Sequence, residues 1–115
     1  MRSHWQLWVD CRDQRKSRKV LRRVADCIGR EPFDVVIHRL EDGHRVAFVI
    51  ELEARSWSDA VVETIALGQR IAYRWNISSC LGYANESLAG GARKIDLFKI
   101  AGVEAASWEI ENCGD

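Results

Sequence analysis

Residues 33–52 read FDVVIHRLEDGHRVAFVIEL, and this stretch decides the fold because it places two apolar segments around Asp42-Gly43. An Asp-Gly pair between such segments is a strong signal for a β-hairpin with a two-residue turn. A turn at these residues places Glu41 opposite His44, which aligns the apolar side chains of both segments into one stripe for a helix-covered face. The expected pairs in this stripe are Phe33 with Leu52, Val35 with Ile50, and Ile37 with Phe48.

The same register places polar side chains on the opposite face of the hairpin. His38 belongs to this face, and Asp34 stands directly opposite Glu51, with Glu53 two residues farther along. Two carboxylates facing each other destabilise a strand pair unless a cation or a basic partner offsets their charge. In the preceding apolar segment, 5–9, alternation sends Trp8 to this same face. We therefore expect an open sheet face with an apolar strip around Trp8 and an acidic end.

The elements outside the hairpin complete a strand–helix–strand–strand–helix–strand order. This order predicts an α+β fold, the ferredoxin-like split β-α-β-β-α-β arrangement, with two helices on one face of an antiparallel sheet. A chain of 115 residues is expected to form a single domain over residues 1–115. Gly68 lies inside the second helix, where glycine costs about 1 kcal/mol relative to alanine, so close packing is expected there. The expected segments are a strand over 5–9, helices over 12–29 and 56–76, a strand over 77–83, a loop over 85–93, a strand over 95–100 and a short closing segment over 105–110.

Charge is unevenly distributed along the chain, although 17 basic and 17 acidic residues give a net charge of zero. Residues 1–23 hold eight basic and two acidic side chains, a net charge of +6, and the remainder carries −6. A protein that binds nucleic acid with its whole surface is basic throughout, which argues against a nucleic-acid partner. The basic segment 12–23 opens a helix, where the macrodipole disfavours cations. It is either a solvated helix face or an anion site.

Cysteine spacing and hydropathy set further expectations about cofactors and compartment. No pair among Cys11, Cys27, Cys80 and Cys113 has the spacing of a zinc site, so neither a metal nor another cofactor is predicted. No apolar run approaches the roughly 18 residues of a membrane span, which argues against a membrane partner. The first residues lack the apolar segment of a signal peptide, so we expect a cytoplasmic protein with free thiols.

Two short motifs resemble a nuclease core. Pro32-Phe33-Asp34 precedes the hairpin and Glu51-Leu52-Glu53 ends it, and the following helix carries Gln69 and Tyr73 in the spacing Q-x3-Y. This pattern is similar to the PD-(D/E)xK nucleases, and the resemblance implies Mg²⁺-dependent cleavage of nucleic acid. The metal-binding carboxylates that it implies are Asp34, Glu51 and Glu53. Because Glu53 stands where these nucleases carry lysine, activation of water would need another base.

Three functions from different classes remain open on the sequence. The favoured interpretation is a non-enzymatic protein-binding domain, in its most concrete form a bacterial immunity protein that occludes the active site of a basic toxin with carboxylates and an aromatic anchor. The predicted partner-binding residues are Trp8, Asp34, His38, Glu51 and Glu53. One alternative is the Mg²⁺-dependent nuclease. The other is a small-ligand sensor with its ligand near residues 10–17.

Overall fold

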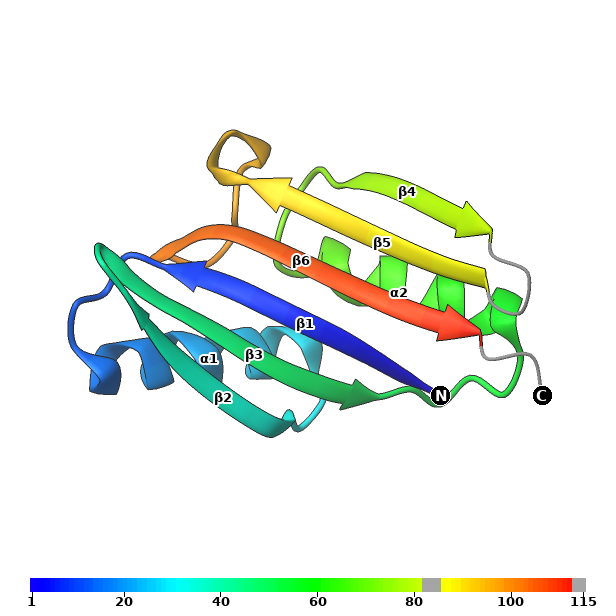
Figure 1. Ribbon diagram of the computed structural model, residues 1–115, viewed down its shortest axis with the longest axis horizontal. Coiled ribbons are helices and arrows are strands. Elements are labelled where there is room, and N and C mark those ends of the chain that lie inside the picture. Colours follow the sequence, from blue (N-terminus) through cyan, green and yellow to red (C-terminus); the bar gives the residue numbers. More distant parts are fainter. Residues whose placement is uncertain (82–85, 113–115) are drawn as a thin grey trace.

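Six strands and two α-helices make up the computed structural model, which describes residues 1–81 and 86–112. The elements in chain order are β1 (Arg2–Val9), α1 (Gln14–Ile28), β2 (Phe33–Leu40), β3 (Gly43–Glu51), α2 (Trp57–Gln69), β4 (Asn76–Leu81), β5 (Glu86–Arg93), the 3₁₀ helix η1 (Lys94–Asp96) and β6 (Val103–Asn112). The strands form one antiparallel sheet in the order β2-β3-β1-β6-β5-β4 (Figure 1).

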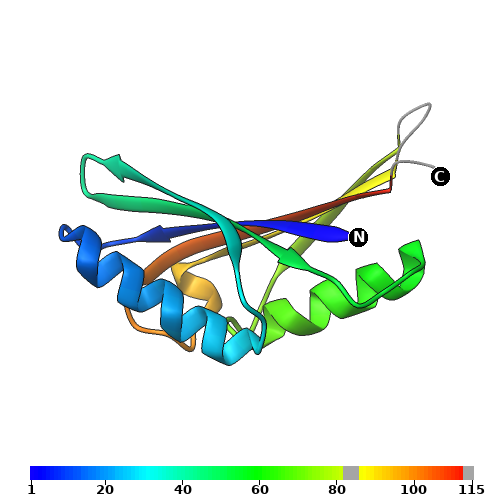
Figure 2. The same ribbon diagram turned by 90° about the horizontal axis from the view of Figure 1, so that it is seen from below.

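Both helices cover the same face of this sheet, as Figure 2 shows. The predicted α+β class, with an antiparallel sheet and two helices on one face, is therefore confirmed. The sheet is larger than predicted, because residues 86–93 form β5 instead of a loop. The strand predicted over 95–100 is not found: η1 is followed by irregular backbone with one isolated bridge, Phe98 to Ala72, and the apolar side chains of Ile95 and Leu97 are exposed. The short closing segment is in fact β6, a long strand in the middle of the sheet.

The core centres on aromatic side chains from the middle of the sheet and from the segment between α2 and β4. Trp5 on β1 lies opposite Trp108 on β6, and both are almost completely buried. The ring of Trp5 also stacks on Phe48, with a centroid distance of 6.2 Å, and meets Trp75 edge-on at 6.2 Å. The Nε1–H group of Trp5 donates a hydrogen bond of 2.8 Å to Oγ of Ser3. Large aromatic side chains thus fill the space between sheet and helices.

Two glycines make room for this aromatic cluster. A Cβ atom at Gly68 of α2 would lie 3.2 Å from both Trp75 and Trp108, and the Nε1–H group of Trp75 donates to the Gly68 carbonyl at 2.9 Å. The predicted close packing at Gly68 is confirmed. A Cβ atom at Gly90 of β5 would lie only 2.4 Å from the Trp108 ring. Gly90, one of the small residues that made this segment resemble a loop, is therefore a packing requirement of β5.

The hairpin turn comprises Glu41 and Asp42, one residue earlier than predicted, so Leu40 lies opposite Gly43. The predicted pairs are displaced by two residues; Ile37, for example, faces Val46. Because side chains alternate with a period of two, this displacement keeps each β3 side chain on its predicted face. Gly43 has a φ of +151°, and a Cβ atom there would lie 2.1 Å from the carbonyl oxygen of Val9.

A bulge at the start of β2 alters the faces of the residues around it. The register shifts between Phe33 and Val36, and Asp34 within the bulge has a positive φ of 51°. Phe33 consequently pairs with Val49, and its ring lies 5.1 Å below the guanidinium of Arg2. The prediction that Phe33 belongs to the helix-covered stripe is wrong, because the extra residue in the bulge moves its side chain to the opposite face. Val35 lies on the helix-covered side as predicted, where it lines a hollow with Leu21 and Ala25 of α1.

Polar contacts fix both helices at their ends. The carboxylate of Asp13 caps α1 by accepting from the N–H of Arg15, Gly29 ends the helix in the left-handed conformation, and Oγ of Ser56 caps α2. Within the described residues, no helix is both long enough and apolar enough to cross a membrane. Cys11 and Cys27 are free thiols, whereas the side chains of Cys80 and Cys113 lie outside the described part.

Candidate functional site

The sheet face away from the helices, called the open face here, is the candidate site. Its side chains alternate with those of the core, so that on β1 Leu7 is buried while Gln6 is exposed and Trp8 is half-buried. The predicted segregation of β1 side chains is confirmed. Both ends of the sheet curve away from the helices, and the open face is therefore concave (Figure 2). The strand pairing gives its central side chains as His4, Gln6 and Trp8 on β1, Arg45, Ala47 and Val49 on β3, and Ala105, Ser107 and Glu109 on β6.

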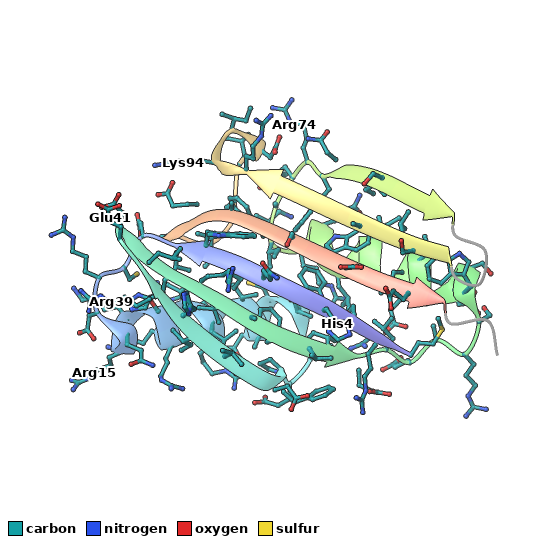
Figure 3. All side chains as sticks on the ribbon, in the orientation of Figure 1. His4, Arg15, Arg39, Glu41, Arg74 and Lys94 are labelled. Atoms are coloured by element: carbon teal, nitrogen blue, oxygen red, sulfur yellow. The ribbon has the colours of Figure 1, made fainter. Side chains whose placement is uncertain are left out.

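A shallow groove of about 250 Å³, called the central groove here, lies in the open face. Gln6 stands between Ala47 and Ser107 on the neighbouring strands, and these small side chains leave the sheet uncovered on both sides of it. Two residues from Gln6 along β1, on the same face of the sheet, His4 lies opposite Glu109 of β6. Figure 3 shows His4 on β1 in the view onto this face. The full polar lining is His4, Gln6, Asp34, Ser107 and Glu109.

The carboxylates of Asp34 and Glu109 both line the central groove, and both residues are exposed. In the described part of the chain, neither carboxylate forms an ion pair. The expectation that Asp34 stands opposite Glu51 is wrong, because the shifted turn and the bulge place Phe33 opposite Val49. Asp34 instead shares the groove with a residue of β6.

Trp8 lies at the other end of the open face, between Arg45 on β3 and Ala105 on β6. Arg45 in turn pairs with His38 on β2, so the predicted residues Trp8 and His38 belong to one row across three strands. The strip around Trp8 is not purely apolar as expected, since its neighbour on β3 is an arginine. The open face therefore has a basic, aromatic end and an acidic groove.

Glu51 lies near the chain start, at the end of β3. Its carboxylate receives a hydrogen bond of 3.1 Å from Nε of Arg2, the residue directly opposite on β1, and the N-terminal ammonium of Met1 lies 4.0 Å away. The cation that this carboxylate needs is thus supplied by the protein's own first strand. The charge of Glu51 is therefore compensated within the protein and does not require a basic binding partner.

Glu53 belongs to a separate network that joins β3 to both helices. Its carboxylate lies 3.7 Å from Nη2 of Arg30, whose Nη1 donates to Glu63 of α2 at 2.6 Å. Glu63 also accepts from the backbone N–H groups of Glu53 and Ala54, each at 2.9 Å. Burial opposes ionisation of Glu63, but these three hydrogen bonds outweigh it and lower the pKa of Glu63 below its ordinary value.

We expect the substitution Glu63→Gln to destabilise the protein in a pH-dependent manner. A carboxyl group whose pKa is lower in the folded state stabilises it fully above the unfolded-state pKa, and this contribution is lost as the pH falls through the folded-state pKa. At pH 7 the free energy of unfolding should fall by about 1–3 kcal/mol, because a charge-assisted network is broken. The difference should shrink below about pH 4. Urea titrations of both proteins from pH 3 to pH 7 test this.

Glu53→Gln is the matched control for this experiment, since Glu53 is 83% exposed and contacts only one end of the network. Its stability should stay close to that of the unmodified protein at every pH. A pH-independent loss in Glu63→Gln would contradict the assigned role of the ionised carboxylate.

The three carboxylates of the nuclease resemblance have separate surroundings. Asp34 lines the central groove, Glu51 contacts Arg2, and Glu53 contacts Arg30. Across residues 1–81 and 86–112, no group of three or more His, Cys, Asp or Glu side chains is placed to hold a metal ion. The implied arrangement of Asp34, Glu51 and Glu53 around one metal is therefore not assembled.

The junction proposed for a small ligand, near residues 10–17, is occupied by a buried histidine. Nδ1 of His44 lies 2.7 Å from the carbonyl oxygen of Cys11 and 3.0 Å from Oγ of Ser17, and both His44 and Ser17 are buried. A ring N–H on Nδ1 can donate to both oxygens, which ties the hairpin to the start of α1.

Sequence reasoning missed Ser107 and Glu109 as open-face residues, because 105–110 was interpreted as a short closing segment. A signal was present in the sequence, since Ala106, Trp108 and Ile110 alternate with polar residues, as in a strand with one buried face.

No family model, no curated protein and no solved structure matches this chain.

Proposed function

We propose that the protein is a non-enzymatic protein-binding domain that receives a basic segment of its partner on the open face. The supporting observation is a concave, uncovered face that combines the half-buried Trp8 with a groove lined by Asp34 and Glu109, whose carboxylates form no ion pair among the residues that the structure describes. An antiparallel sheet commonly leaves one face to solvent, but that face is then mainly polar. Here Val36, 61% exposed, adds apolar surface to that of Trp8.

The chemistry of the face determines what the partner segment must carry. A lysine or arginine placed in the central groove would pair with Asp34 and Glu109, which gains most when the pair is shielded from water. An apolar or aromatic side chain would pack on Trp8, as tryptophans at interface centres commonly supply much of the binding energy. Arg45 lies next to Trp8, so the partner side chain placed against it should be neutral or acidic and not a second cation.

In its most specific form, the proposed partner is a bacterial toxin and the domain is its immunity protein. The carboxylates of the central groove would cover a basic active site, and Trp8 would anchor the complex. Charge complementarity between the groove and a basic toxin supports this form.

The finer fold assignment is also a proposal. We propose that β1, β2, β3 and β6 with the two helices form a ferredoxin-like core that the β4–β5 hairpin extends at one edge. In support, β3 lies between β1 and β2, which α1 connects, and β1 lies between β3 and β6. The hairpin is inserted between α2 and β6.

Removing the groove charges should abolish partner binding while the fold is kept. A photo-crosslinking amino acid at Gln6 should capture one partner from cells of the source organism, and the capture should be lost in the double substitution Asp34→Asn/Glu109→Gln. Trp8→Ala should weaken the purified complex by about 10–100-fold, the range of an interface anchor. If the captured protein is a toxin, the unmodified domain should inhibit it at an equimolar ratio.

Glu41→Gln/Asp42→Asn is the matched control, because it removes two exposed carboxylates at the hairpin tip (Figure 3). This variant should bind the partner as tightly as the unmodified domain does. Equal capture from a crosslinker at Asp59 on α2, or capture that is unaffected by the groove substitutions, would exclude the open face as the binding surface.

A further inference from the structure

The exposed side of α1, together with Arg12 just before the helix begins, carries a dense cluster of basic side chains. Seven basic side chains, all exposed, form what is called the basic face here: Arg12, Arg15, Lys16, Arg18, Lys19, Arg22 and Arg23. The opposite side of the helix buries Val20, Leu21 and Val24 against the sheet. At 3.6 residues per turn, the basic side chains cover an arc of about 160°, so they occupy nearly the whole solvent side of the helix.

Little negative charge within the molecule compensates this face. Arg22 pairs with Asp26 and with Glu31, whereas the other six cations form no ion pair in the described part of the chain. The first turn of α1 contains no acidic residue and carries Arg15 and Lys16, although the helix dipole disfavours cations there. The protein thus bears a local electrostatic cost that an external polyanion would offset.

The cations point to both flanks of α1. On one flank, Lys16, Lys19 and Arg23 line a hollow of about 370 Å³ beside the turn at Ala101 and Gly102. The other flank has a hollow of about 180 Å³, whose lining includes Arg18 and Arg22. A partner with two parallel rows of anions would therefore be contacted on both sides of the helix.

The fold also separates this charge from the acidic groove. α1 lies on the helix-covered side of the sheet, whereas Asp34 and Glu109 line the open face on the other side (Figure 2). Charge balance along the chain, which alone argues against a nucleic-acid partner, does not distinguish these two faces. A local patch of one sign can attract a polyanion even when the net charge of the protein is zero.

We propose that the basic face of α1 is a second binding surface, independent of the open face, and that it binds double-stranded DNA through its phosphates. Residues 15–23 of α1 carry six basic side chains over about 12 Å of helix, one per about 2 Å, which is comparable to the one charge per about 1.7 Å of duplex DNA. A helix about 10–12 Å wide fits the B-form major groove, where a phosphate backbone runs along each side. The A-form groove of RNA is too narrow for it.

Single-stranded nucleic acid fits this surface less well. Proteins that bind single strands present aromatic side chains on which bases stack. The exposed side of α1 carries no aromatic residue, and its charge is mostly arginine, which pairs with phosphate through two parallel hydrogen bonds. We therefore assign the surface to the backbone of a duplex, with little preference for base sequence.

The test measures binding of the full chain to a fluorescein-labelled DNA duplex of about 20 base pairs by fluorescence anisotropy. With about six phosphate contacts, the affinity should fall about 10³-fold between 50 and 200 mM salt, and duplexes of unrelated sequence should bind alike. The triple substitution Lys16→Gln/Lys19→Gln/Arg23→Gln should reduce the slope of log affinity against log salt by about 3. At 50 mM salt its affinity should be at least about 100-fold weaker.

The matched control Arg55→Gln/Arg74→Gln/Lys99→Gln removes the same charge from exposed positions outside α1. Arg74 lies on the opposite side of the molecule from Arg15 in Figure 3. This control and the groove variant Asp34→Asn/Glu109→Gln should both bind DNA as the unmodified protein does, so a failed open-face proposal leaves this one intact. Circular dichroism checks that every variant is folded.

Four outcomes would overturn the proposal. The first two are a DNA affinity that does not change with salt, and equal losses of DNA affinity in the test and control triples. The other two are tighter binding of a single strand or an RNA duplex of the same sequence, and poly-glutamate of the same charge competing as well as unlabelled DNA does. The last would assign the basic face to an acidic polypeptide.

Discussion

Replacement of Trp108 by alanine is expected to lower the free energy of unfolding by about 3–5 kcal/mol, the range for large-to-small changes at buried aromatic positions. The Trp108 ring is 1% exposed and lies between Trp5 and Trp75, with centroid distances of 6.5 and 6.4 Å. Gly68 and Gly90 have no side chain that could move into the vacated space. The cavity therefore cannot collapse, and urea denaturation at pH 7 should show the full loss.

Trp8→Ala removes the same side chain from the other face of the sheet and is the control for this measurement. Trp8 is half-buried on the open face and has no part in the core cluster. We expect its loss to cost well under half of the Trp108→Ala effect, because solvent fills the space that it leaves. Similar losses in both variants would contradict the assignment of Trp108 to the centre of the core.

Gly43→Ala is the second change with a large expected effect, on the order of 3 kcal/mol. A methyl group there would lie 2.1 Å from the carbonyl oxygen of Val9. The methyl carbon is bonded directly to the backbone of β3 and the oxygen belongs to the backbone of β1, the paired strand, so neither can move alone. The φ of +151° adds strain for any residue other than glycine. Relief would require β1 and β3 to separate at the hairpin end, and thermal unfolding should show a clearly lowered midpoint.

Gly91→Ala tests whether the effect comes from the contact with the Val9 carbonyl rather than from replacing any strand glycine by alanine. Gly91 also lies in a paired strand, but a Cβ atom there would have no neighbour within 4 Å. Its replacement should change stability by less than about 1 kcal/mol and in the favourable direction, since glycine weakens a strand interior. The explanation fails if Gly43→Ala proves as mild as Gly91→Ala.

The hairpin shows how far local sequence patterns determine the fold. Alternation correctly assigned the β3 side chains to their faces, because the actual register differs by an even number of residues. The turn was misplaced by one position, because the deciding contact is between Gly43 and Val9, which are far apart in the sequence. The bulge at Asp34 was equally invisible, since nothing in Asp34-Val35-Val36 distinguishes a bulged strand from a regular one.

The last third of the chain was harder to predict for a related reason. Residues 87–92 are mostly small, which is typical of a loop, yet Gly90 among them is required by the Trp108 ring beside it. Ile95 and Leu97 are apolar but exposed, so hydropathy predicted a strand where the chain turns. Composition indicates secondary structure only when local preference and tertiary packing agree.

The candidate site was predicted in outline but not in detail. Trp8 and His38 were placed on the open face, as found, and Asp34 was expected there but with the wrong neighbour. Its actual companion, Glu109, comes from β6, and its place in the sheet depends on pairing between the two ends of the chain. The strand order of the sheet determines which charged side chains share a groove. A sequence pattern within one hairpin does not predict that order.

The pairing of β1 with β6 has a consequence for how the molecule is made. These central strands come from opposite ends of the described chain, and contacts between such distant residues slow folding. A polypeptide is synthesised from its N-terminus at about 5–20 residues per second. Until β6 emerges from the ribosome, the backbone groups of β1 that pair with β6 therefore lack hydrogen-bond partners, and Trp5 is uncovered. We expect nascent chains that stop before β6 to aggregate or to be held by chaperones, and native structure to arise only after synthesis has passed that strand.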